Sequence, residues 1–427
     1  MENNTIKIED VHTTLTSYFD KEKVKDLSDL KIYEGWTLVS NRDVSGKILY
    51  HNGVYLGTNE GPLLYYSYDL KNWTICENNN NNNGNGTYEF TFFNNIWLAF
   101  GYGWNDNLEA STGLIEYSYD GINWKSAYQP IIDSNIYSFQ VVQNNNTIIV
   151  YDNSNESYIM SNDGINWYNQ EVSLGGMDID EGYAAFKIPP VFGDNKWAAL
   201  TYTGIYTSTD GKRWTYVTEN PWGGSVWEVS LYYTGGRWYL AEFMDYYTVY
   251  TSTDLTSWEQ VLVEDTYFSP YSGELPIIFH QNHYFINDTD NWCIIHSSDG
   301  VHFYYDYELG AWMEVVIIND KILFGFEGAS LYYYNNEAWQ SIPNTTPLSP
   351  YYSIIQHDNK IYVSGVDFNI GGPYIYVLDI NTLEVLDEGT CSVYLYNLQS
   401  VNNQLISTSS QGVCMQRSLQ DLIDNIQ

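Results

Sequence analysis

The side chains of this chain that could take part in catalysis or binding recur at a regular spacing. A Ser-x-Asp-Gly-x-x-Trp phrase, or a close variant, returns about every 45 residues. Each copy brings one carboxylate and one aromatic side chain: Asp69 and Trp73, Asp120 and Trp124, Asp163 and Trp167, Asp210 and Trp214, Asp254 and Trp258, Asp299 and Phe303. A carboxylate can act as a general acid or base. Six equivalent acids in six equivalent repeats do not suit one reaction, so these residues are interpreted as structural.

The phrase predicts a strand, a tight turn and a second strand. Ser and Asp oxygens accept hydrogen bonds from the N–H groups of such a turn, and Gly tolerates the positive φ that it requires. Leu70 and Leu255 replace Gly in two copies, so a slightly different backbone is expected there. The recurrent aromatic residue is expected to pack between neighbouring repeats.

This phrase resembles the Asp-box, or BNR repeat, found in sialidases, sortilin-like receptors, some glycoside hydrolases and photosystem assembly factors. The resemblance covers roughly residues 33–417 and implies a β-propeller fold. It implies no single activity, because that family contains enzymes, receptors and assembly proteins. A sialidase-like site needs an arginine triad, and the arginines of this chain are only Arg42, Arg213, Arg237 and Arg417. Sialidase activity is therefore not expected.

A second pattern, a polar turn followed by an apolar strand, gives an independent count of the repeats. Such turns contain Asn52, Asn95, Asn146, Asn195, Gly236, Asn282, Asp320, Asn359 and Asn403. Asn and Gly in short turns between apolar runs predict hairpins. The pattern predicts an all-β chain, a single β-propeller of nine four-stranded blades, with eight blades as the alternative because propellers usually have four to eight.

The last repeat lacks a fourth strand, whereas residues 32–39 read as a fourth strand without a blade. We expect the N-terminal strand to complete the C-terminal blade, which removes open sheet edges. The predicted organisation is an N-terminal arm over residues 1–31 and a propeller over residues 32–427.

The charge of the chain limits its partners. It contains 17 Lys and Arg against 53 Asp and Glu, a net charge of −36. Nucleic acids and anionic membranes attract cationic surfaces, so neither is an expected partner. Basic proteins, divalent cations and neutral glycans remain. The sequence offers no metal-binding or cofactor-binding motif, so no metal and no cofactor is predicted.

Loops that depart from the repeat are the candidate binding segments. Aromatic residues beside Asp or Asn suit sugars, because rings contact C–H surfaces and polar groups bind hydroxyls. The candidate ligand-binding residues are Tyr102, Trp104, Asp106, Trp222, Trp227, Asp245, Tyr246, Asp367 and Phe368. The alternative is that these aromatics cover neighbouring blades.

The function expected from the sequence is a non-enzymatic structural or binding propeller without catalytic residues. A place in a phage particle, such as its tail, or in a surface assembly that recognises a glycan or a protein partner is favoured by three features. These are the absence of a recognisable signal peptide, the N-terminal arm, through which a protein partner would bind, and the loops rich in Asn and Tyr. The alternatives are a glycoside hydrolase or lyase acting on a polysaccharide, and an intracellular assembly scaffold located in the cytoplasm.

Overall fold

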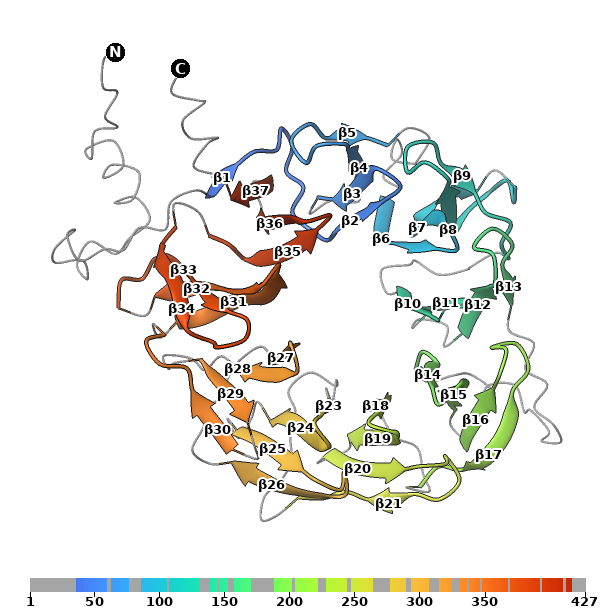
Figure 1. Cartoon of the computed structure of the whole chain (residues 1–427). Helices are drawn as coiled ribbons and strands as arrows, with labels where there is room; N and C mark the ends of the chain where they lie inside the picture. The colour runs from blue at the N-terminus through green and yellow to red at the C-terminus, as the bar shows by residue number, and fades with distance from the viewer. Residues whose placement is uncertain are drawn as a thin grey trace. The chain divides into compact units, whose positions relative to one another are not determined.

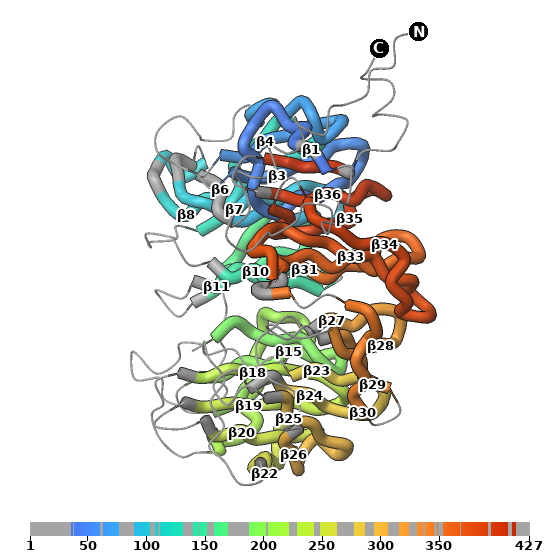
Figure 2. The backbone as a smooth tube through the Cα atoms, turned by 90° about the vertical axis from the view of Figure 1, so that its left-hand side faces the viewer, coloured from blue at the N-terminus to red at the C-terminus, as the bar shows by residue number. Residues whose placement is uncertain are grey.

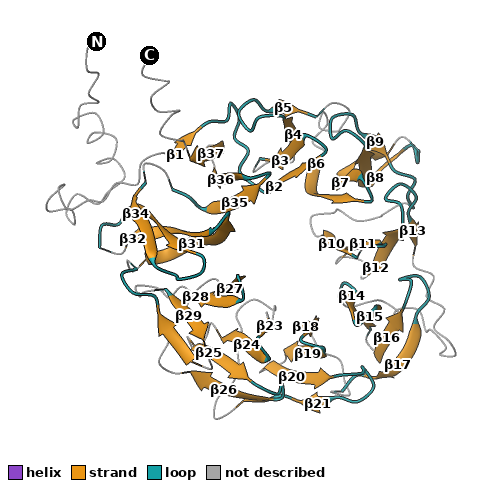
Figure 3. Cartoon of the chain, viewed as in Figure 1, coloured by secondary structure: helices purple, strands orange, loops and turns teal. Residues whose placement is uncertain are grey.

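A computed structural model describes most of the chain between residues 36 and 416. The described residues are 36–59, 63–76, 86–105, 107–130, 139–144, 146–152, 157–169, 188–201, 204–221, 228–243, 247–263, 277–288, 293–306, 315–324, 331–335, 338–345, 348–367, 369–391, 394–409 and 412–416. All regular structure among them is β-strand (Figure 3). None of them belongs to a helix with the length and hydropathy needed to span a bilayer. The predicted arm over residues 1–31 lies outside the described residues.

The strands form nine separate sheets, each built on four antiparallel strands in up-and-down order, and one of them has a fifth strand added; this confirms the predicted nine-bladed β-propeller (Figure 1). We number the blades in chain order. They fall into two compact units: one holds the described residues of 1–61, 65–75 and 310–427, and the other those of 62–64 and 76–309. We refer to them as the four-blade and the five-blade unit.

The five-blade unit contains blades 2 to 6. Blade 2 consists of β6 (Gly86–Phe93), β7 (Ile96–Asn105), β8 (Ala110–Ser118) and β9 (Lys125–Ser126). Blade 3 consists of β10 (Phe139–Gln143), β11 (Ile148–Asp152), β12 (Ser157–Ser161) and β13 (Tyr168–Asn169). Blade 4 consists of β14 (Val191–Gly193), β15 (Lys196–Leu200), β16 (Gly204–Ser208) and β17 (Thr215–Glu219). Blade 5 consists of β18 (Glu228–Thr234), β19 (Arg237–Phe243), β20 (Tyr247–Ser252) and β21 (Glu259–Gln260). Blade 6 consists of β23 (Ile277–His280), β24 (His283–Asp288), β25 (Cys293–Ser297) and β26 (His302–Asp306).

Blade 6 carries a fifth strand that the sequence pattern did not predict. The strand β22 (Leu262–Val263) follows blade 5 in the chain and pairs in parallel with β26 of blade 6. A similar link joins blades 2 and 3, where the Tyr128 N–H donates to the Ile165 carbonyl at 2.9 Å. The end of one blade is therefore hydrogen-bonded to the turn of the next. Figure 2 shows β18, β19 and β20 of blade 5 following one another as adjacent strands.

The four-blade unit contains blades 1, 7, 8 and 9. Blade 1 consists of β2 (Ile48–His51), β3 (Val54–Thr58), β4 (Leu64–Ser67) and β5 (Thr74–Ile75). Blade 7 consists of β27 (Val315–Ile318), β28 (Lys321–Phe324), β29 (Tyr332–Asn335) and β30 (Ala338–Ser341). Blade 8 consists of β31 (Leu348–His357), β32 (Lys360–Asp367), β33 (Pro373–Asp379) and β34 (Val385–Thr390). Blade 9 consists of β35 (Asn397–Val401), β36 (Gln404–Ser409), β37 (Gly412–Gln416) and β1 (Trp36–Leu38).

Blade 9 confirms the predicted closure by an N-terminal strand. Its sheet has the order β1-β37-β36-β35, with Trp36 opposite Gln416 and Leu38 opposite Cys414. The indole of Trp36 is buried in the core between blades 8 and 9. The strand thus supplies both backbone pairing and a large apolar side chain.

The first hairpin of most blades has the turn that its sequence predicts. Both turn residues have positive φ, as a type I′ turn requires. Asn52 and Gly53 have φ of 53° and 86°, and Asn94 and Asn95 have 47° and 62°. The same conformation occurs at Asp194–Asn195, Gly235–Gly236, Gln281–Asn282, Asn319–Asp320 and Asn402–Asn403. Asn, Asp and Gly are the residues that adopt it at least cost.

Within each unit the core lies between successive blades, because strand side chains alternate between the two faces of each sheet. In β15, Trp197 and Ala199 pack toward blade 3, whereas Ala198 and Leu200 pack toward blade 5. Both faces of a blade are therefore buried, which explains the near-continuous apolar runs of the second strands. The three cysteines described with their side chains, Cys76, Cys391 and Cys414, are buried and form no disulfide.

Candidate functional site

The aspartates of the repeated Ser-x-Asp phrase, here called the box aspartates, accept hydrogen bonds from their own turns, here called the box turns. In blade 2 the Asp120 Oδ1 accepts the N–H groups of Ile122 at 2.9 Å and Asn123 at 2.8 Å, and the Ser118 hydroxyl at 2.9 Å. The Trp124 indole N–H donates to the Gly121 carbonyl at 3.2 Å. The same pair of N–H donors binds one carboxylate oxygen at Asp69, Asp163, Asp210, Asp254 and Asp299.

These hydrogen bonds determine the charge of the turns. Burial acts to raise the pKa of Asp120, but the bonds from Asn123, Ile122 and Ser118 outweigh it and lower that pKa to about 2. The pKa of Asp69 is lowered to about 2 by the corresponding donors. A carboxyl held in the ionised state cannot deliver a proton near neutral pH, so the turns suit structure and not general acid catalysis.

The aromatic residues of the boxes are buried or partly buried. The side chains of Trp73, Trp124, Trp167, Trp214 and Phe303 are buried, and Trp258 is partly buried. At the two Leu-containing turns the backbone difference is small. Leu70 and Leu255 have φ of 63° and 71°, whereas Gly121, Gly164, Gly211 and Gly300 have 75–77°. Both leucine side chains are buried, which offsets the strain of the left-handed conformation.

The structure describes two of the predicted ligand-binding side chains. Tyr102 in β7 is half-buried and packs against the core between blades 2 and 3. Asp367 at the end of β32 is buried, and its Oδ1 accepts the N–H groups of Asn369 at 2.7 Å and Ile370 at 3.0 Å. Asp367 thereby stabilises its own loop, and ligand binding at Tyr102 and Asp367 stays a prediction.

The other predicted binding residues are not brought together by the described structure. The backbone of Trp104 belongs to β7 and pairs with Ser111, but its side chain is outside the described part. Asp106, Trp222, Trp227, Asp245, Tyr246 and Phe368 all lie outside the described residues. The predicted loop site therefore stays a prediction.

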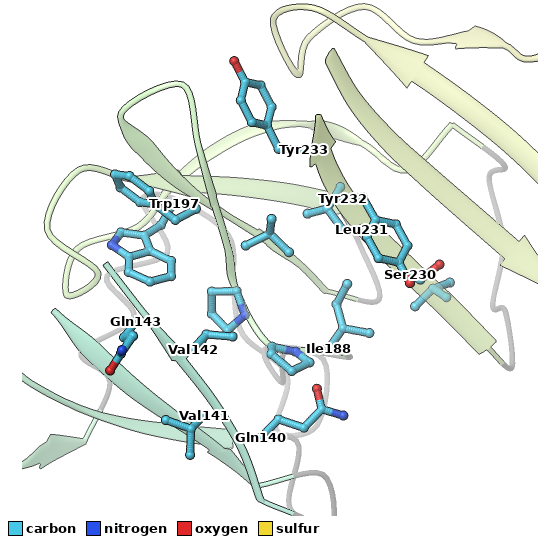
Figure 4. Close-up of a pocket in the computed structure, with 15 residues that line it drawn as sticks. Gln140, Val141, Val142, Gln143, Ile188, Trp197, Ser230, Leu231, Tyr232 and Tyr233 are labelled. Carbon is cyan, nitrogen blue, oxygen red and sulfur yellow. The ribbon is translucent and has the colours of Figure 1, made fainter. Parts of the chain in front are cut away.

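A pocket in the five-blade unit was not predicted. Its volume is about 690 Å³, within the range of small-molecule sites. The lining comes from the first strands of three successive blades, from the segment before β14 and from Trp197 of β15: Gln140, Val141, Val142, Gln143, Ile188, Pro189, Pro190, Val191, Phe192, Trp197, Val229, Ser230, Leu231, Tyr232 and Tyr233. Figure 4 shows Gln140 to Gln143 along one strand, Ser230 to Tyr233 along another, and Ile188 between them.

Three of the strands that line this pocket are sheet edges. β10, β14 and β18 each pair with only one strand of their own blade, β11, β15 and β19 respectively. One side of each edge strand has backbone N–H and C=O groups that its own sheet does not pair. The pocket can thus offer both hydrogen-bond donors and acceptors from the backbone.

Aromatic side chains form part of the pocket wall. The Phe192 ring is 40% exposed, and it rests edge-on against the buried Trp197 indole with 5.1 Å between ring centroids. Tyr233 packs beside Trp238, with 4.7 Å between their centroids. Cross-strand aromatic pairs of this kind hold the first hairpin rigid. The exposed face of Phe192 is therefore a preformed apolar surface.

The lining is uncharged. None of its 15 residues is Asp, Glu, Lys, Arg or His, although charged residues make up 16% of the chain. Gln140 and Gln143 are exposed and carry amides, and Ser230, Tyr232 and Tyr233 carry hydroxyls. An ion would lose hydration in such a pocket without finding a partner charge. The lining suits a neutral ligand with both apolar and hydrogen-bonding surface.

One buried carboxyl lies beside this lining. Glu242 in β19 pairs in register with Val229 and is 7% exposed. Its Oε2 has no hydrogen-bond partner among the described residues, and burial raises the pKa of its carboxyl. Cross-strand partners share a face of the sheet, so Glu242 and Val229 project to the same side. In its neutral form this carboxyl can donate a hydrogen bond.

Metal binding has no obvious place in the described structure. Among the described residues no group of three or more His, Cys, Asp and Glu side chains is arranged to hold a metal ion.

The sequence signal that could have revealed the pocket is weak, because the apolar runs at 140–143 and 229–233 look like ordinary strands. Only the absence of charge in all three lining segments distinguishes them.

No family model and no curated protein sequence matches the chain. Similar solved structures include BamB from Moraxella catarrhalis, 10% identical, with a TM-score of 0.42 over 76% of this chain and 92% of that one. Apo AztD from Citrobacter koseri is 13% identical, with a TM-score of 0.40 over 86% and 98%. Sqt1 from Saccharomyces cerevisiae is 9% identical, with a TM-score of 0.44 over 91% and 98%.

At these scores the comparisons carry no argument about function. The chain is a β-propeller by its own strand pairing, with nine four-stranded blades. Membership of the Asp-box family stays a prediction that rests on the repeated phrase.

Proposed function

We propose that this propeller is a non-enzymatic binding protein and that the pocket of blades 3 to 5 holds an uncharged ligand. The observation that carries the proposal is the lining, which combines an exposed aromatic face, amides, hydroxyls and edge-strand backbone without a charged side chain. Among neutral ligands, a glycan matches this mixture best, because a sugar presents C–H faces and hydroxyls together.

The same lining supports binding over hydrolysis. A glycosidase needs two carboxyl groups on opposite sides of the bond that it cleaves. The lining residues include no carboxylate, imidazole, thiol or amine. The box aspartates, which are the recurrent acids of the chain, hold their turns.

The biological setting that we propose is a phage particle or another surface assembly, in which the propeller recognises a glycan or a protein partner. This setting rests on sequence features, the arm over residues 1–31 and the loops rich in Asn and Tyr. If the arm anchors the propeller, protein lacking residues 1–31 will fold and fail to enter the particle. Normal incorporation of that protein would contradict the anchoring role.

Two sets of variants test the location of the ligand site. Purified protein is applied to an array of neutral and acidic glycans, beside a pocket variant (Gln140→Ala with Phe192→Ala) and a loop variant (Trp104→Ala with Trp222→Ala). We expect binding to neutral glycans that only the pocket variant loses. Loss in the loop variant alone would return the site to the predicted loops. Absence of glycan binding at high protein concentration would contradict the glycan, and reducing-sugar release would contradict the non-enzymatic proposal.

A further inference from the structure

In two of the box turns the residue directly before the aspartate is a tyrosine. The sequence Tyr-Ser-Tyr-Asp occurs at residues 66–69 in blade 1 and at residues 117–120 in blade 2. The other four boxes have Asn162, Thr209, Thr253 and Ser298 before the aspartate. Tyr68 and Tyr119 are 64% and 61% exposed, more than any other large hydrophobic side chain that the structure describes.

The two copies have the same geometry. The rings of Tyr66 and Tyr68 have centroids 5.9 Å apart and an interplanar angle of 79°. The rings of Tyr117 and Tyr119 are 5.8 Å apart at 86°. Since one copy lies in each compact unit, the arrangement follows from the four-residue sequence and not from one particular environment. The T-shaped contact holds the outer ring in a defined orientation on the surface.

Each outer tyrosine adjoins a permanent negative charge. The carboxylates of Asp69 and Asp120 follow Tyr68 and Tyr119 directly, and both are exposed. Each Oδ2 accepts one hydrogen bond, from the side-chain amide of Asn72 or Asn123 at 2.8 Å, and keeps a second lone pair for a cation. Hydrogen bonds within the turn keep both aspartates ionised across the neutral range. The combination of an exposed ring and a fixed carboxylate attracts a cation by two mechanisms at once.

The structure contains an internal example of a cation on an exposed tyrosine. The Lys212 ammonium lies over the ring of Tyr168, 4.9 Å from its centroid. Lys212 belongs to the box turn of blade 4, and Tyr168 begins β13 of blade 3 and is 52% exposed. Tyr68 and Tyr119 offer a comparable ring face, and a chain with 17 Lys and Arg against 53 acids supplies few cations of its own.

We propose that the two Tyr-Ser-Tyr-Asp turns are docking sites for arginine or lysine side chains of a basic protein partner. In each turn the outer tyrosine ring receives the face of the cationic group and the neighbouring carboxylate neutralises its charge. A planar guanidinium can stack on a ring and hydrogen-bond a carboxylate at the same time, so arginine is the preferred residue. This surface is separate from the uncharged pocket and does not depend on its function.

The test must separate specific docking from the general attraction of polycations to a chain of net charge −36. A labelled nona-arginine peptide is titrated against the full chain and two double variants at 150 mM salt. The docking variant is Tyr68→Leu with Tyr119→Leu. The matched control is Tyr304→Leu with Tyr396→Leu, at tyrosines that are 46% and 47% exposed outside the box turns. All three proteins have the same net charge.

We expect the docking variant to bind the peptide about two- to five-fold more weakly than the control, the usual effect of losing one exposed cation–π contact. Equal affinities in the two variants would overturn the proposal, because only non-specific attraction would then remain. A thermal melt of both variants verifies that the fold is intact. If the docking variant melts early, Tyr68→Thr with Tyr119→Thr replaces it, because Thr209 and Thr253 occupy the same position in two other boxes, and the same loss of affinity is expected.

Discussion

Gly193 lies directly against the side chain of Tyr233, so that a Cβ on Gly193 would be 2.2 Å from the Tyr233 Cγ. Gly193 ends the first strand of blade 4, and Tyr233 lies in the first strand of blade 5 and lines the pocket. The missing side chain of one blade thus makes room for an aromatic ring of the next. The contact sets how closely the two edge strands approach beside the pocket.

Substitution of Gly193 should therefore destabilise the protein through Tyr233. We expect Gly193→Ala to cost about 1–3 kcal/mol in the free energy of unfolding, as is usual for overpacking. The double variant Gly193→Ala with Tyr233→Ala should lose less stability than the two single variants lose in sum, because the clash disappears when the ring is removed. Urea unfolding of the two single variants and the double variant measures the coupling. Additive effects would show that the two residues do not constrain each other.

Acid should weaken the box turns in a defined range of pH. The folded-state pKa of Asp120 is about 2, below the ordinary value of 3.8. A lowered pKa contributes stability that is present above pH 3.8 and is lost as the pH falls toward 2. We expect the stability of the wild type to fall more steeply over this range than that of Asp120→Asn. Parallel curves from urea unfolding at pH 2 to 5 would contradict the prediction.

The buried Glu242 should have the opposite dependence on pH. Its folded-state pKa is raised from 4.5 by burial, so the folded state holds its proton more tightly than the unfolded chain does. Stability is then lost as the pH rises above 4.5. We expect Glu242→Gln to be more stable than the wild type at pH 8, with the difference vanishing below pH 4.5. An unchanged difference across that range would mean that Glu242 titrates normally.

The thermal stability should depend on the N-terminal strand β1 and not on the segment before it. Deletion of residues 1–31 leaves β1 and its pairing with β37 intact, so we expect little change in thermal stability. Deletion of residues 1–38 removes β1, unpairs β37 and takes away the buried Trp36. Loss of a buried Trp side chain alone costs about 3–5 kcal/mol. Scanning calorimetry of both deletions should show a lower melting temperature for the second only.

The blades were predictable from the sequence because their signals are local and repeated. The turn at Asn52–Gly53 and the box at Asp120 each require particular residues at fixed offsets. Nine polar turns and six boxes make the count of blades reliable. In blade 8 the box is reduced to Asp379, which still binds the N–H groups of Asn381 and Thr382. The strand at Trp36–Leu38 was predictable because it follows no hairpin of its own and the ninth blade lacked a fourth strand.

The pocket and the fifth strand of blade 6 were not predictable in the same way. The pocket depends on the approach of Gln140, Ile188 and Val229, which are far apart in the sequence and unremarkable in type. The strand β22 has two residues, and its parallel partner β26 belongs to the next blade. Both features arise from how neighbouring repeats pack, and that packing has no local, repeated signal in the sequence.

The pairing of β1 with β37 also has a consequence for biosynthesis. Trp36 meets Gln416, 380 residues further along the chain (416 minus 36). At about 5–20 residues per second a ribosome needs roughly 20–80 s to make that interval. During this time β1 exists without its partner, while the intervening blades can already form. The last blade is therefore assembled only after residue 416 has been translated, and a nascent chain that stalls earlier exposes the unpaired strand β1 to chaperones and proteases.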